Sequence, residues 1–472
     1  MRRRQCGMQR STRFGRVAMT SWERQVPSGS GNRQLPVVRG WPLLGSAIAL
    51  IRNPLGFLQA TRSTHGDVYR VKAAHMNFVV LAGIEANRFV ADKGKDCFVS
   101  SGFWEATLQE MQCPHSFIGV DGDAHRFQRN LMKPLFSKSA FNERIPMLAQ
   151  IFTDTLQARY GADQQVSSLF RHVLSQQIGG SLQGYRPTAD EVEALMRYQN
   201  TAMNVCALKK WPRLALRMPG YRAAKKQVQA LADRIIESER TQEHTQGYFQ
   251  TLKEKGQMVQ PQWFTPGDMR NHAIISYLAG IDTVGATLSF MLLELFKQPH
   301  LHQRLRDEVD ACFSQGLPDA DGLENMETLK NFIREVMRLY PTAYAVRRTA
   351  AKDFEFQGYS ISKGQDIILF TTANHTDPAW FKNPLAFDVT RYEEPRLEHR
   401  ASGAWAPFGR GPHTCIGAGL ANILLSLNLA LFLYHTDLRP ACKLSDIKMD
   451  FSNPTAGLSE RFAISFTPRN RT

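Results

Sequence analysis

The sequence contains few cysteines and no long apolar run. Its seven cysteines form no Cys-x-x-Cys pair, and their number is odd. This pattern excludes a disulfide framework and a paired-cysteine metal or redox motif, and it indicates reduced thiols in a reducing compartment. The apolar stretch 41–51 is far shorter than the roughly 20 residues of a membrane-spanning helix. We therefore expect a cytoplasmic protein without a transmembrane anchor.

Acidic residues are absent from the N-terminus. The first 16 residues contain six arginines, and the first acid is Glu23. No apolar run follows, which excludes a secretory signal. Two interpretations remain open: an Arg-rich peptide that targets an organelle, or a disordered basic tail with Met19 as an alternative start. In both interpretations residues 1–34 form a basic extension outside the folded part.

Nucleic-acid-binding motifs are also lacking. The net charge of +15 and a pI near 9.6 favour an acidic partner, which could be nucleic acid, anionic lipid or an acidic protein. There is no zinc-finger spacing, RNA-binding aromatic signature or basic zipper, so nucleic acid is excluded. A hydrophobic content of 43% is typical of a globular chain. No repeat or polar linker divides residues 35–472, which we expect to form a single catalytic domain.

The spacing of apolar residues is mainly helical. Thr265 and Pro266 are typical of a helix start and open a long helix that ends near residue 297. Alternating patterns predict strands over 66–72 and 77–83, short strands within 343–372 and an irregular stretch over 373–414. Further helices are predicted by apolar residues three and four positions apart: 125–136, 146–160, 191–203, 228–240, 299–313, 326–339 and one just after Cys415. The fold class is therefore mainly α with small β-sheets.

The segment PFGRGPHTCIGAGLA (407–421) surrounds Cys415 with glycines. Gly409 and Gly411 permit a tight loop that delivers Cys415 to the start of a helix. There the free backbone N–H groups and the helix dipole favour a thiolate over a thiol. Gly417 lets the helix approach a flat cofactor closely. A lone cysteine would ordinarily be a small buried residue, so the surrounding pattern carries the argument.

Five positions of this loop share a fixed spacing: Phe408, Gly411, His413, Cys415 and Gly417. The loop resembles the haem-binding loop of the cytochrome P450 superfamily, and the resemblance spans about residues 35–470. It implies that haem b lies between the long central helix and the helix after Cys415, with Cys415 as the iron ligand.

Two further segments follow the family's order. REVMRLYP (334–341) supplies Glu335 and Arg338 on one helical face, which by themselves would be an ordinary surface ion pair. FDVTRY (387–392) supplies Arg391, although Val389 stands where the family has a proline. The resemblance implies that these three residues form a buried triad that holds the haem loop.

The long helix contains AGIDTVGAT (279–287), in which Asp282 and Thr283 interrupt an apolar run and need a polar partner or a cavity. The segment resembles the distal motif of the family. The resemblance places Ala279 and Gly280 beside the haem, with Gly280 and Thr283 loosening the helix to admit O2 and water. It assigns proton delivery to Asp282 and Thr283, which favours a monooxygenase over a haem-thiolate isomerase.

Haem propionates need cations. His125 and Arg129 lie one turn apart on a predicted helix, so both can reach the same anion. The resemblance adds His413 and one arginine from VRRTA (346–350). That arginine is either Arg348, which we favour, or Arg347.

The implied reaction inserts one oxygen atom from O2 into an apolar small organic substrate. No flavin, nicotinamide or iron–sulfur motif is present, so the electrons come from a separate redox partner such as a ferredoxin, flavodoxin or reductase. Basic side chains near Cys415 are expected to bind this partner: Arg126, Lys133, Arg400 and Arg410. A haem-thiolate peroxygenase or isomerase and a non-enzymatic haem sensor remain as alternatives.

The substrate itself is not determined by the sequence. Several large apolar residues indicate an apolar cavity, without choosing among lipids, terpenoids, steroids, polyketides and xenobiotics: Phe103, Trp104, Phe117, Ala279 and Val346. The segment 209–226 has seven cations and no acid. It is either a solvated loop or a peripheral contact with an anionic membrane.

Overall fold

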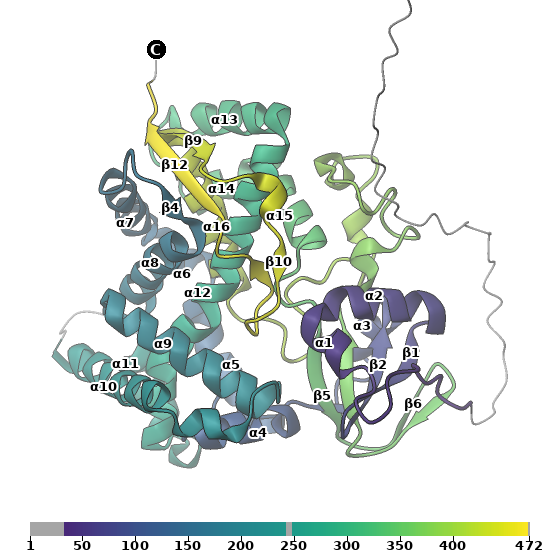
Figure 1. The fold of residues 1–472 in the computed structure, drawn as a ribbon. Coiled ribbons are helices and arrows are strands. Elements are labelled where there is room, and N and C mark those ends of the chain that lie inside the picture. The colour runs from purple at the N-terminus through teal and green to yellow at the C-terminus, as the bar shows by residue number, and fades with distance from the viewer. Residues whose placement is uncertain (1–32, 242–247, 471–472) are drawn as a thin grey trace, which may run out of the picture.

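A computed structural model describes residues 33–241 and 248–470. Its central element is α12 (Pro266–Lys297), which runs through the middle of the helical part (Figure 1). The Thr265 side chain accepts a hydrogen bond from the Asp268 N–H, and the Asp268 carboxylate accepts one from the Thr265 N–H. This reciprocal cap starts the helix at the predicted residue. The predicted basic extension lies almost entirely outside the described residues.

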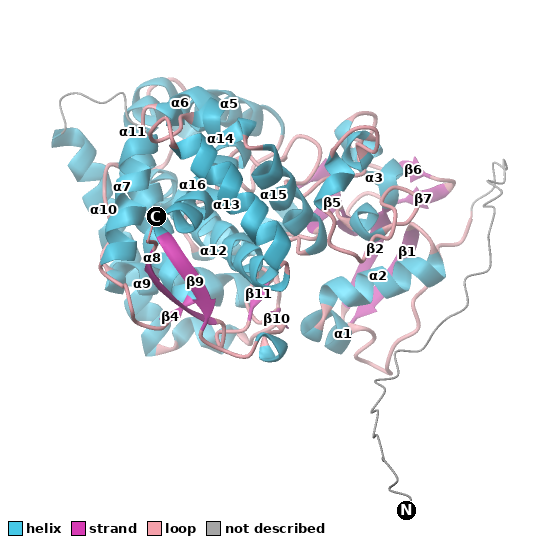
Figure 2. Ribbon diagram, turned by 90° about the horizontal axis from the view of Figure 1, so that it is seen from above, coloured by secondary structure: helices cyan, strands magenta, loops and turns pink. Residues whose placement is uncertain are grey.

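The other long helices pack around α12 and form one body, with a strand-rich part beside it (Figure 2). Helix α8 has more contacts with α12 than any other helix and lies along its flank. The helices that build this body are α4 (Ser101–Glu110), α5 (Gly122–Met132), α7 (Ile145–Gln157), α8 (Val166–Ile178), α9 (Ala189–Ala202), α10 (Pro219–Thr241), α13 (Pro299–Phe313), α15 (Glu327–Leu339) and α16 (Ala418–His435).

The strand-rich part is built on a five-stranded sheet in the order β1-β2-β8-β5-β3. Strands β2 and β8 are parallel, and the other neighbours are antiparallel. Helix α2 (Pro54–His65) packs on β1, and α3 (Gly83–Ala91) follows β2 directly. The strands are β1 (Val68–Ala73), β2 (Met76–Ala82), β3 (Phe98–Val99), β5 (Val346–Ala350) and β8 (Asp366–Phe370).

Three smaller sheets complete the strands. One joins β4 (Gln164–Gln165), β12 (Ala463–Pro468) and β9 (Thr436–Pro440), and two are hairpins. The hairpins are β6 (Phe354–Phe356) with β7 (Tyr359–Ile361), and β10 (Met449–Asp450) with β11 (Gly457–Leu458). The fold is therefore mainly α with small β-sheets, as the sequence predicts.

Most predicted elements are confirmed within a few residues. Helix α12 has the predicted bounds, and the stretch 373–414 contains only short 3₁₀ turns. No helix was predicted over the residues of α8, which lies directly against α12.

The helices α12 and α16 are long and apolar enough to cross a bilayer. However, 72% of the most apolar window of α12 and 61% of that of α16 are buried inside the fold. Leucine and phenylalanine side chains of both helices belong to the largest hydrophobic core. Their apolar character is therefore explained by packing within the protein.

Candidate active site

The loop before α16 holds Cys415 in a fixed position. The Cys415 N–H donates to the Phe408 carbonyl at 3.0 Å, which closes the loop. Gly411 has φ +84°, and a Cβ there would lie 2.7 Å from the Val90 carbonyl oxygen. Only glycine fits both requirements. The loop is thus shaped by its glycines, and Gly417 is the N-cap residue of α16.

The Cys415 side chain faces an internal space. It has solvent-accessible surface, yet protein surrounds it closely enough for burial to raise the pKa of its thiol. Two groups act in the opposite direction and lower this pKa: the Gly417 N–H, which points at the sulfur, and the Arg129 guanidinium. The site therefore offers a thiolate both a hydrogen bond and a nearby positive charge.

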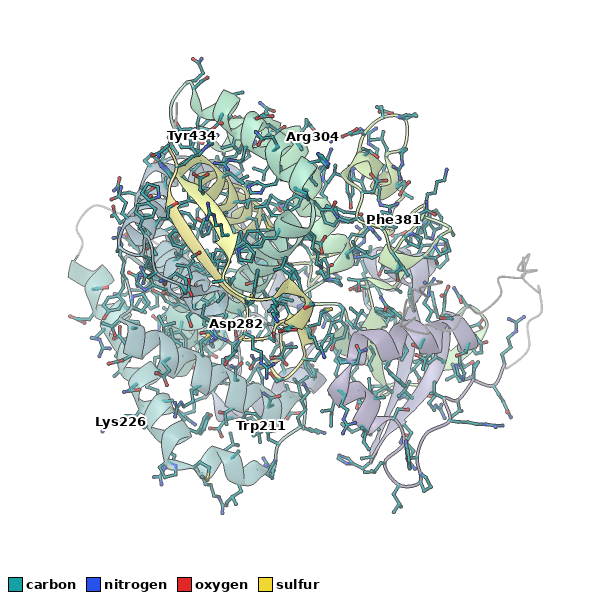
Figure 3. All side chains as sticks on the ribbon, turned by 45° about the horizontal axis from the view of Figure 1, so that its top comes forward. Trp211, Lys226, Asp282, Arg304, Phe381 and Tyr434 are labelled. Carbon is teal, nitrogen blue, oxygen red and sulfur yellow. The ribbon has the colours of Figure 1, made fainter. Side chains whose placement is uncertain are left out.

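The side chains of the distal motif of α12 lie on two sides of the helix. Ala279 and Thr283 line a cavity, and the Thr283 hydroxyl donates to the Ala279 carbonyl at 2.7 Å. The Asp282 carboxylate instead meets Arg171 of α8, whose Nε lies 3.3 Å from Oδ1. The Asp282 side chain is 11% exposed, and Figure 3 labels its position in the middle of the molecule. Arg171 was not singled out from the sequence because α8 was not predicted.

The expected loosening of α12 is not seen. The helix is continuous from Pro266 to Lys297. A Cβ at Gly280 would lie 2.7 Å from the Ile178 Cδ1 atom, so this glycine lets α8 approach α12 closely. The structure thus places Gly280 against α8 and leaves Ala279 and Thr283 to line the cavity.

Glu335, Arg338 and Arg391 meet in the protein interior, and all three side chains are fully buried. The Arg338 guanidinium donates to both Glu335 oxygens at 2.7 Å, and the Arg391 Nε donates to Glu335 at 3.1 Å. The Tyr392 hydroxyl also donates to Glu335, at 2.8 Å. With this many partners the buried charges are satisfied. Val389, which replaces the family's proline, is buried beside them without disturbing the contacts.

His375 connects this triad to the cysteine loop. Its Nδ1 lies 3.2 Å from the Arg338 carbonyl, and its Nε2 accepts a hydrogen bond from the Ala406 N–H at 3.0 Å. Burial lowers the pKa of His375 to about 3, so the ring is neutral with its proton on Nδ1. The chain therefore uses a buried neutral histidine to fix the approach to the loop, a role that its sequence position does not reveal.

His125 and His413 lie side by side, with ring centroids 3.9 Å apart. Phe117 stacks on the other face of His125 at 5.0 Å. The His413 Nε2 lies 3.0 Å from the Asp121 carboxylate, which also accepts hydrogen bonds from the backbone of Ser100. The helix α5 therefore brings His125 directly onto the cysteine loop.

The two arginines of β5 have different surroundings. The Arg347 guanidinium lies over the rings of Phe78 and Phe103, at 4.5 and 4.9 Å, and 3.7 Å from Asp366. Within the described ranges the Arg348 side chain donates only to the Arg347 carbonyl, and burial lowers its pKa to about 10. Neighbouring residues of a strand point to opposite faces, which separates the two side chains.

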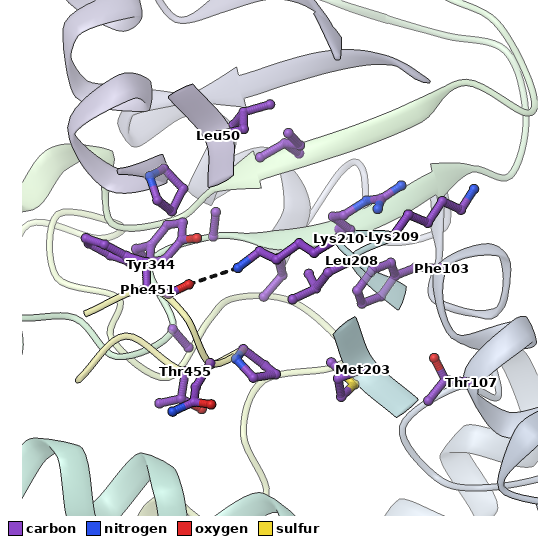
Figure 4. Close-up of a pocket in the computed structure, with 18 of the residues that line it drawn as sticks. Leu50, Phe103, Thr107, Met203, Leu208, Lys209, Lys210, Tyr344, Phe451 and Thr455 are labelled. Carbon is purple, nitrogen blue, oxygen red and sulfur yellow. Dashed lines mark hydrogen bonds between the residues drawn. The ribbon is translucent and has the colours of Figure 1, made fainter. Parts of the chain in front are cut away.

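A cavity of about 630 Å³ extends from α12 toward the sheet. Its walls are mostly apolar, and α4, β5 and the segment around Met203 all contribute (Figure 4). The predicted cavity residues Phe103, Trp104, Ala279 and Val346 line it. Phe117 packs on His125 instead.

A family model described as Cytochrome P450 matches residues 35–460. The chain belongs to the cytochrome P450 family. Curated proteins similar to this chain include P450 enzymes. Cyclooctat-9-en-7-ol 5-monooxygenase of Streptomyces melanosporofaciens is 26% identical over 84% of this chain and 88% of its own length. Cytochrome P450 26B1 of Danio rerio is 25% identical over 82% of this chain and 78% of its own length.

Solved P450 structures have the same fold. The cytochrome P450DA heme domain superposes with a TM-score of 0.79 and covers 92% of this chain and 98% of its own, at 21% identity. The retinoic acid-bound cyanobacterial CYP120A1 has a TM-score of 0.81 and covers 93% of this chain and 100% of its own, at 19% identity. The resemblance found in the cysteine loop is therefore confirmed for the family and for the fold.

Membership in the P450 family implies a haem cofactor, and the residues present fit one. Among the described residues, the buried His125 Nε2 and Arg129 Nη1 have no hydrogen-bond partner. Arg348 is partly buried and makes no ion pair in the described part of the chain, although the Asp121 carboxylate is near enough to raise its pKa. Such groups are costly unless a ligand satisfies them, and haem propionates are anionic acceptors. The Cys415 sulfur would supply the donor atom for the haem iron.

Proposed function

We propose that this P450 is a haem-thiolate monooxygenase that oxidises an apolar small molecule. The observation that carries the proposal is the position of Thr283, whose hydroxyl lines the apolar cavity next to the Asp282–Arg171 pair. The overall reaction is RH + O2 + 2 electrons + 2 protons giving ROH and water. The bound haem b supplies the oxygen-activating chemistry, and the chain's residues hold it and deliver protons.

The proton route uses the two neighbouring residues of α12. The Thr283 hydroxyl donates to Ala279, so its oxygen lone pairs are free to accept a hydrogen bond from water in the cavity. Asp282 accepts from Arg171, and the Arg171 side chain is 29% exposed. A proton can therefore pass from solvent at Arg171 to Asp282 and onward to water at Thr283. This relay favours a monooxygenase over a peroxygenase, an isomerase or a haem sensor, because only the O2-dependent reaction takes up two protons from solvent.

The substrate class is supported by the lining of the cavity. Large aromatic and aliphatic side chains form most of its wall. The Streptomyces relative is named for acting on cyclooctat-9-en-7-ol. An apolar organic molecule is the ligand that such a wall favours.

Two measurements test the proposal. The haem-loaded, reduced protein is expected to show the red-shifted carbon monoxide band of a thiolate-ligated haem, and Cys415→Ala is expected to abolish it while Cys442→Ala retains it. Turnover of a bound apolar compound is then expected with O2, NADPH, ferredoxin and ferredoxin reductase, with one labelled oxygen atom entering the product. Turnover with hydrogen peroxide alone would support the peroxygenase instead. Rearrangement without oxygen uptake would support an isomerase, and binding without any turnover a sensor.

We further infer that a separate redox partner binds the surface near the cysteine loop. Lys133 and Arg400 are exposed there, and Arg126 is exposed although it pairs with Asp123. Arg410 is partly buried, with a long hydrogen bond to Ser402, so it contributes less. Cations of this kind attract an acidic ferredoxin or flavodoxin.

We also infer that the protein is cytoplasmic and touches an anionic membrane through a face beside the cavity mouth. This membrane-facing surface combines α1 (Ala47–Arg52) and the turn Arg213–Arg217. Leu43 is 90% exposed, Leu214 is 64% exposed and Trp211 is 45% exposed. Arg39, Arg52, Arg213 and Arg217 are exposed around them. Ala47, Leu50 and Ile51 of α1 line the cavity, as do Lys209 and Lys210 shortly before the turn, so an apolar compound can enter it directly from a lipid surface.

A further inference from the structure

The charged side chains that line the described cavity are all basic. Among the described residues that line it none is Asp or Glu, whereas five carry basic side chains: His75, Lys209, Lys210, Arg347 and Arg348. Low-dielectric walls strengthen the field of such cations inside a cavity. A neutral apolar substrate needs no such arrangement.

The positions of four of the five basic side chains are explained without a charged substrate. Arg348 faces the proposed propionate site, and Arg347 has Asp366 and two aromatic rings as neighbours. His75 and Lys209 are exposed, so water solvates them. Lys209 also extends away from the Lys210 ammonium (Figure 4). Lys210 is partly buried at the cavity without an ion pair in the described part of the chain, and unlike Arg348 it is not assigned to a propionate.

The local backbone forces Lys210 into this place. The π-helical turn Met203–Ala207 ends α9, and Lys209 then adopts a left-handed conformation with φ +53°. The Lys210 N–H donates to the Asn204 carbonyl at 2.7 Å. The chain therefore turns sharply, and the Lys210 side chain crosses the cavity mouth.

With the residues that the structure describes, the Lys210 ammonium makes one hydrogen bond, to the Phe451 carbonyl at 2.9 Å (Figure 4). Two of its three N–H donors remain. The neighbouring acid Asp450 accepts two hydrogen bonds from Ser452, at 2.9 and 2.7 Å. The Tyr344 ring lies 6.2 Å from that of Phe451, and its hydroxyl has no hydrogen-bond partner in the described residues. Burial lowers the pKa of Lys210.

We infer that Lys210 binds the carboxylate of the substrate, whose apolar body fills the cavity toward Thr283. The inference rests on the proposed function and narrows its substrate class to apolar carboxylic acids. The Asp450 carboxylate is near enough to raise the pKa of Lys210 but makes no ion pair with it in the described residues. A substrate carboxylate would supply that direct partner for the ammonium, and the Tyr344 hydroxyl could donate to its second oxygen. A substrate held by its acid group would present a carbon remote from that group to the oxidising centre.

The test compares an acid with its uncharged ester. Calorimetry with the haem-loaded full chain would use hexadecanoic acid and the rigid abietic acid, each beside its methyl ester. The wild type is expected to bind at least one acid about tenfold more tightly than its ester. Lys210→Met is expected to remove this preference while ester affinity stays within about twofold, which shows that the cavity is intact.

Two further variants sharpen the result. Lys226→Met removes the same charge from an exposed position of α10 outside the cavity, and it is expected to retain the acid preference. Lys210→Glu is expected to reverse the preference, so that hexadecylamine binds more tightly than hexadecanoic acid.

The inference is overturned if ester and acid bind equally to the wild type, if neither acid binds, or if Lys210→Met keeps the preference. Each of these outcomes can occur with a normal thiolate carbon monoxide band and leaves the monooxygenase proposal standing. Loss of that band in the wild type would contradict the proposed function itself.

Discussion

The Asp121 carboxylate lies 3.0 Å from the Nε2 of His413, two residues before the cysteine. Asp121 also accepts hydrogen bonds from the backbone of Ser100 and Ser101, so its position is fixed. These hydrogen bonds lower the pKa of Asp121 although burial acts to raise it. Burial lowers the pKa of His413 overall, although the hydrogen bond to Asp121 acts to raise it. Asp121 therefore fixes the orientation of the His413 ring beside the proposed propionate site.

Removal of this carboxylate is expected to weaken haem binding. Asp121→Asn leaves His413 without its anionic partner, so haem should transfer to apomyoglobin several-fold faster. Asp123→Asn is the matched control because Asp123 lies on the same helix and pairs only with the exposed Arg126. Equal transfer rates in the two variants would contradict the role of Asp121.

Replacement of Arg348 is expected to have opposite effects on the apoprotein and on haem binding. Arg348→Leu removes a partly buried cation that makes no ion pair in the described residues and whose burial costs more than the nearby Asp121 returns, so the apoprotein should become more stable. The same change should weaken haem affinity about tenfold or more, because a charge-assisted hydrogen bond is lost. Arg347→Leu should leave haem affinity within about twofold, and a larger loss there than at Arg348 would reverse the assignment of the two arginines. Thermal unfolding and haem titration measure the two effects.

The buried His375 is expected to make the protein sensitive to acid. Its folded pKa of about 3 lies below the unfolded value near 6.5, so the unfolded state takes up the proton first. The contribution of the neutral ring to the free energy of unfolding is fully present above pH 6.5 and decreases as the pH falls toward 3. At pH 5 the loss amounts to about 2 kcal/mol. Urea unfolding at pH 7 and pH 5 should show this loss for the wild type and a smaller one for His375→Gln, and equal losses would exclude His375 as the cause.

Charge reversal near the cysteine loop is expected to slow reduction of the haem. Lys133→Glu combined with Arg400→Glu should lower the rate with an acidic ferredoxin several-fold and weaken its salt dependence. Arg304→Glu on α13 is the control, since Arg304 is exposed outside this group (Figure 3). Stopped-flow reduction kinetics measure the rates. Unchanged kinetics would place the partner on another surface.

Loss of apolar anchors is expected to reduce membrane binding. Trp211→Ser with Leu214→Ser should lower co-sedimentation with anionic vesicles at low salt, while Leu385→Ser should not. All three residues are exposed, but Leu385 lies away from the cavity mouth. A wild type that fails to bind anionic vesicles would rule out the membrane contact, and equal binding to neutral vesicles would rule out the electrostatic part.

Local sequence patterns accounted for much of the fold. Thr265 and Pro266 marked the start of α12 because capping depends on residues within one turn. The glycines around Cys415 indicated the loop because backbone conformation with positive φ is a local property. The helix α8 was not predicted, and with it the Arg171 partner of Asp282 was missed, since that contact joins residues 111 positions apart.

The sequence by itself determined the family, the cysteine loop and the long central helix. The tertiary structure decided which side chains meet: Arg391 with Glu335, Asp121 with His413, and Lys210 with the Phe451 carbonyl. It also gave Arg347 and Arg348 different neighbours, which supports the predicted choice of Arg348 for the propionate. The physical reason is that ion pairs and cavity walls depend on the distance between elements far apart in the chain, and no local pattern contains that distance.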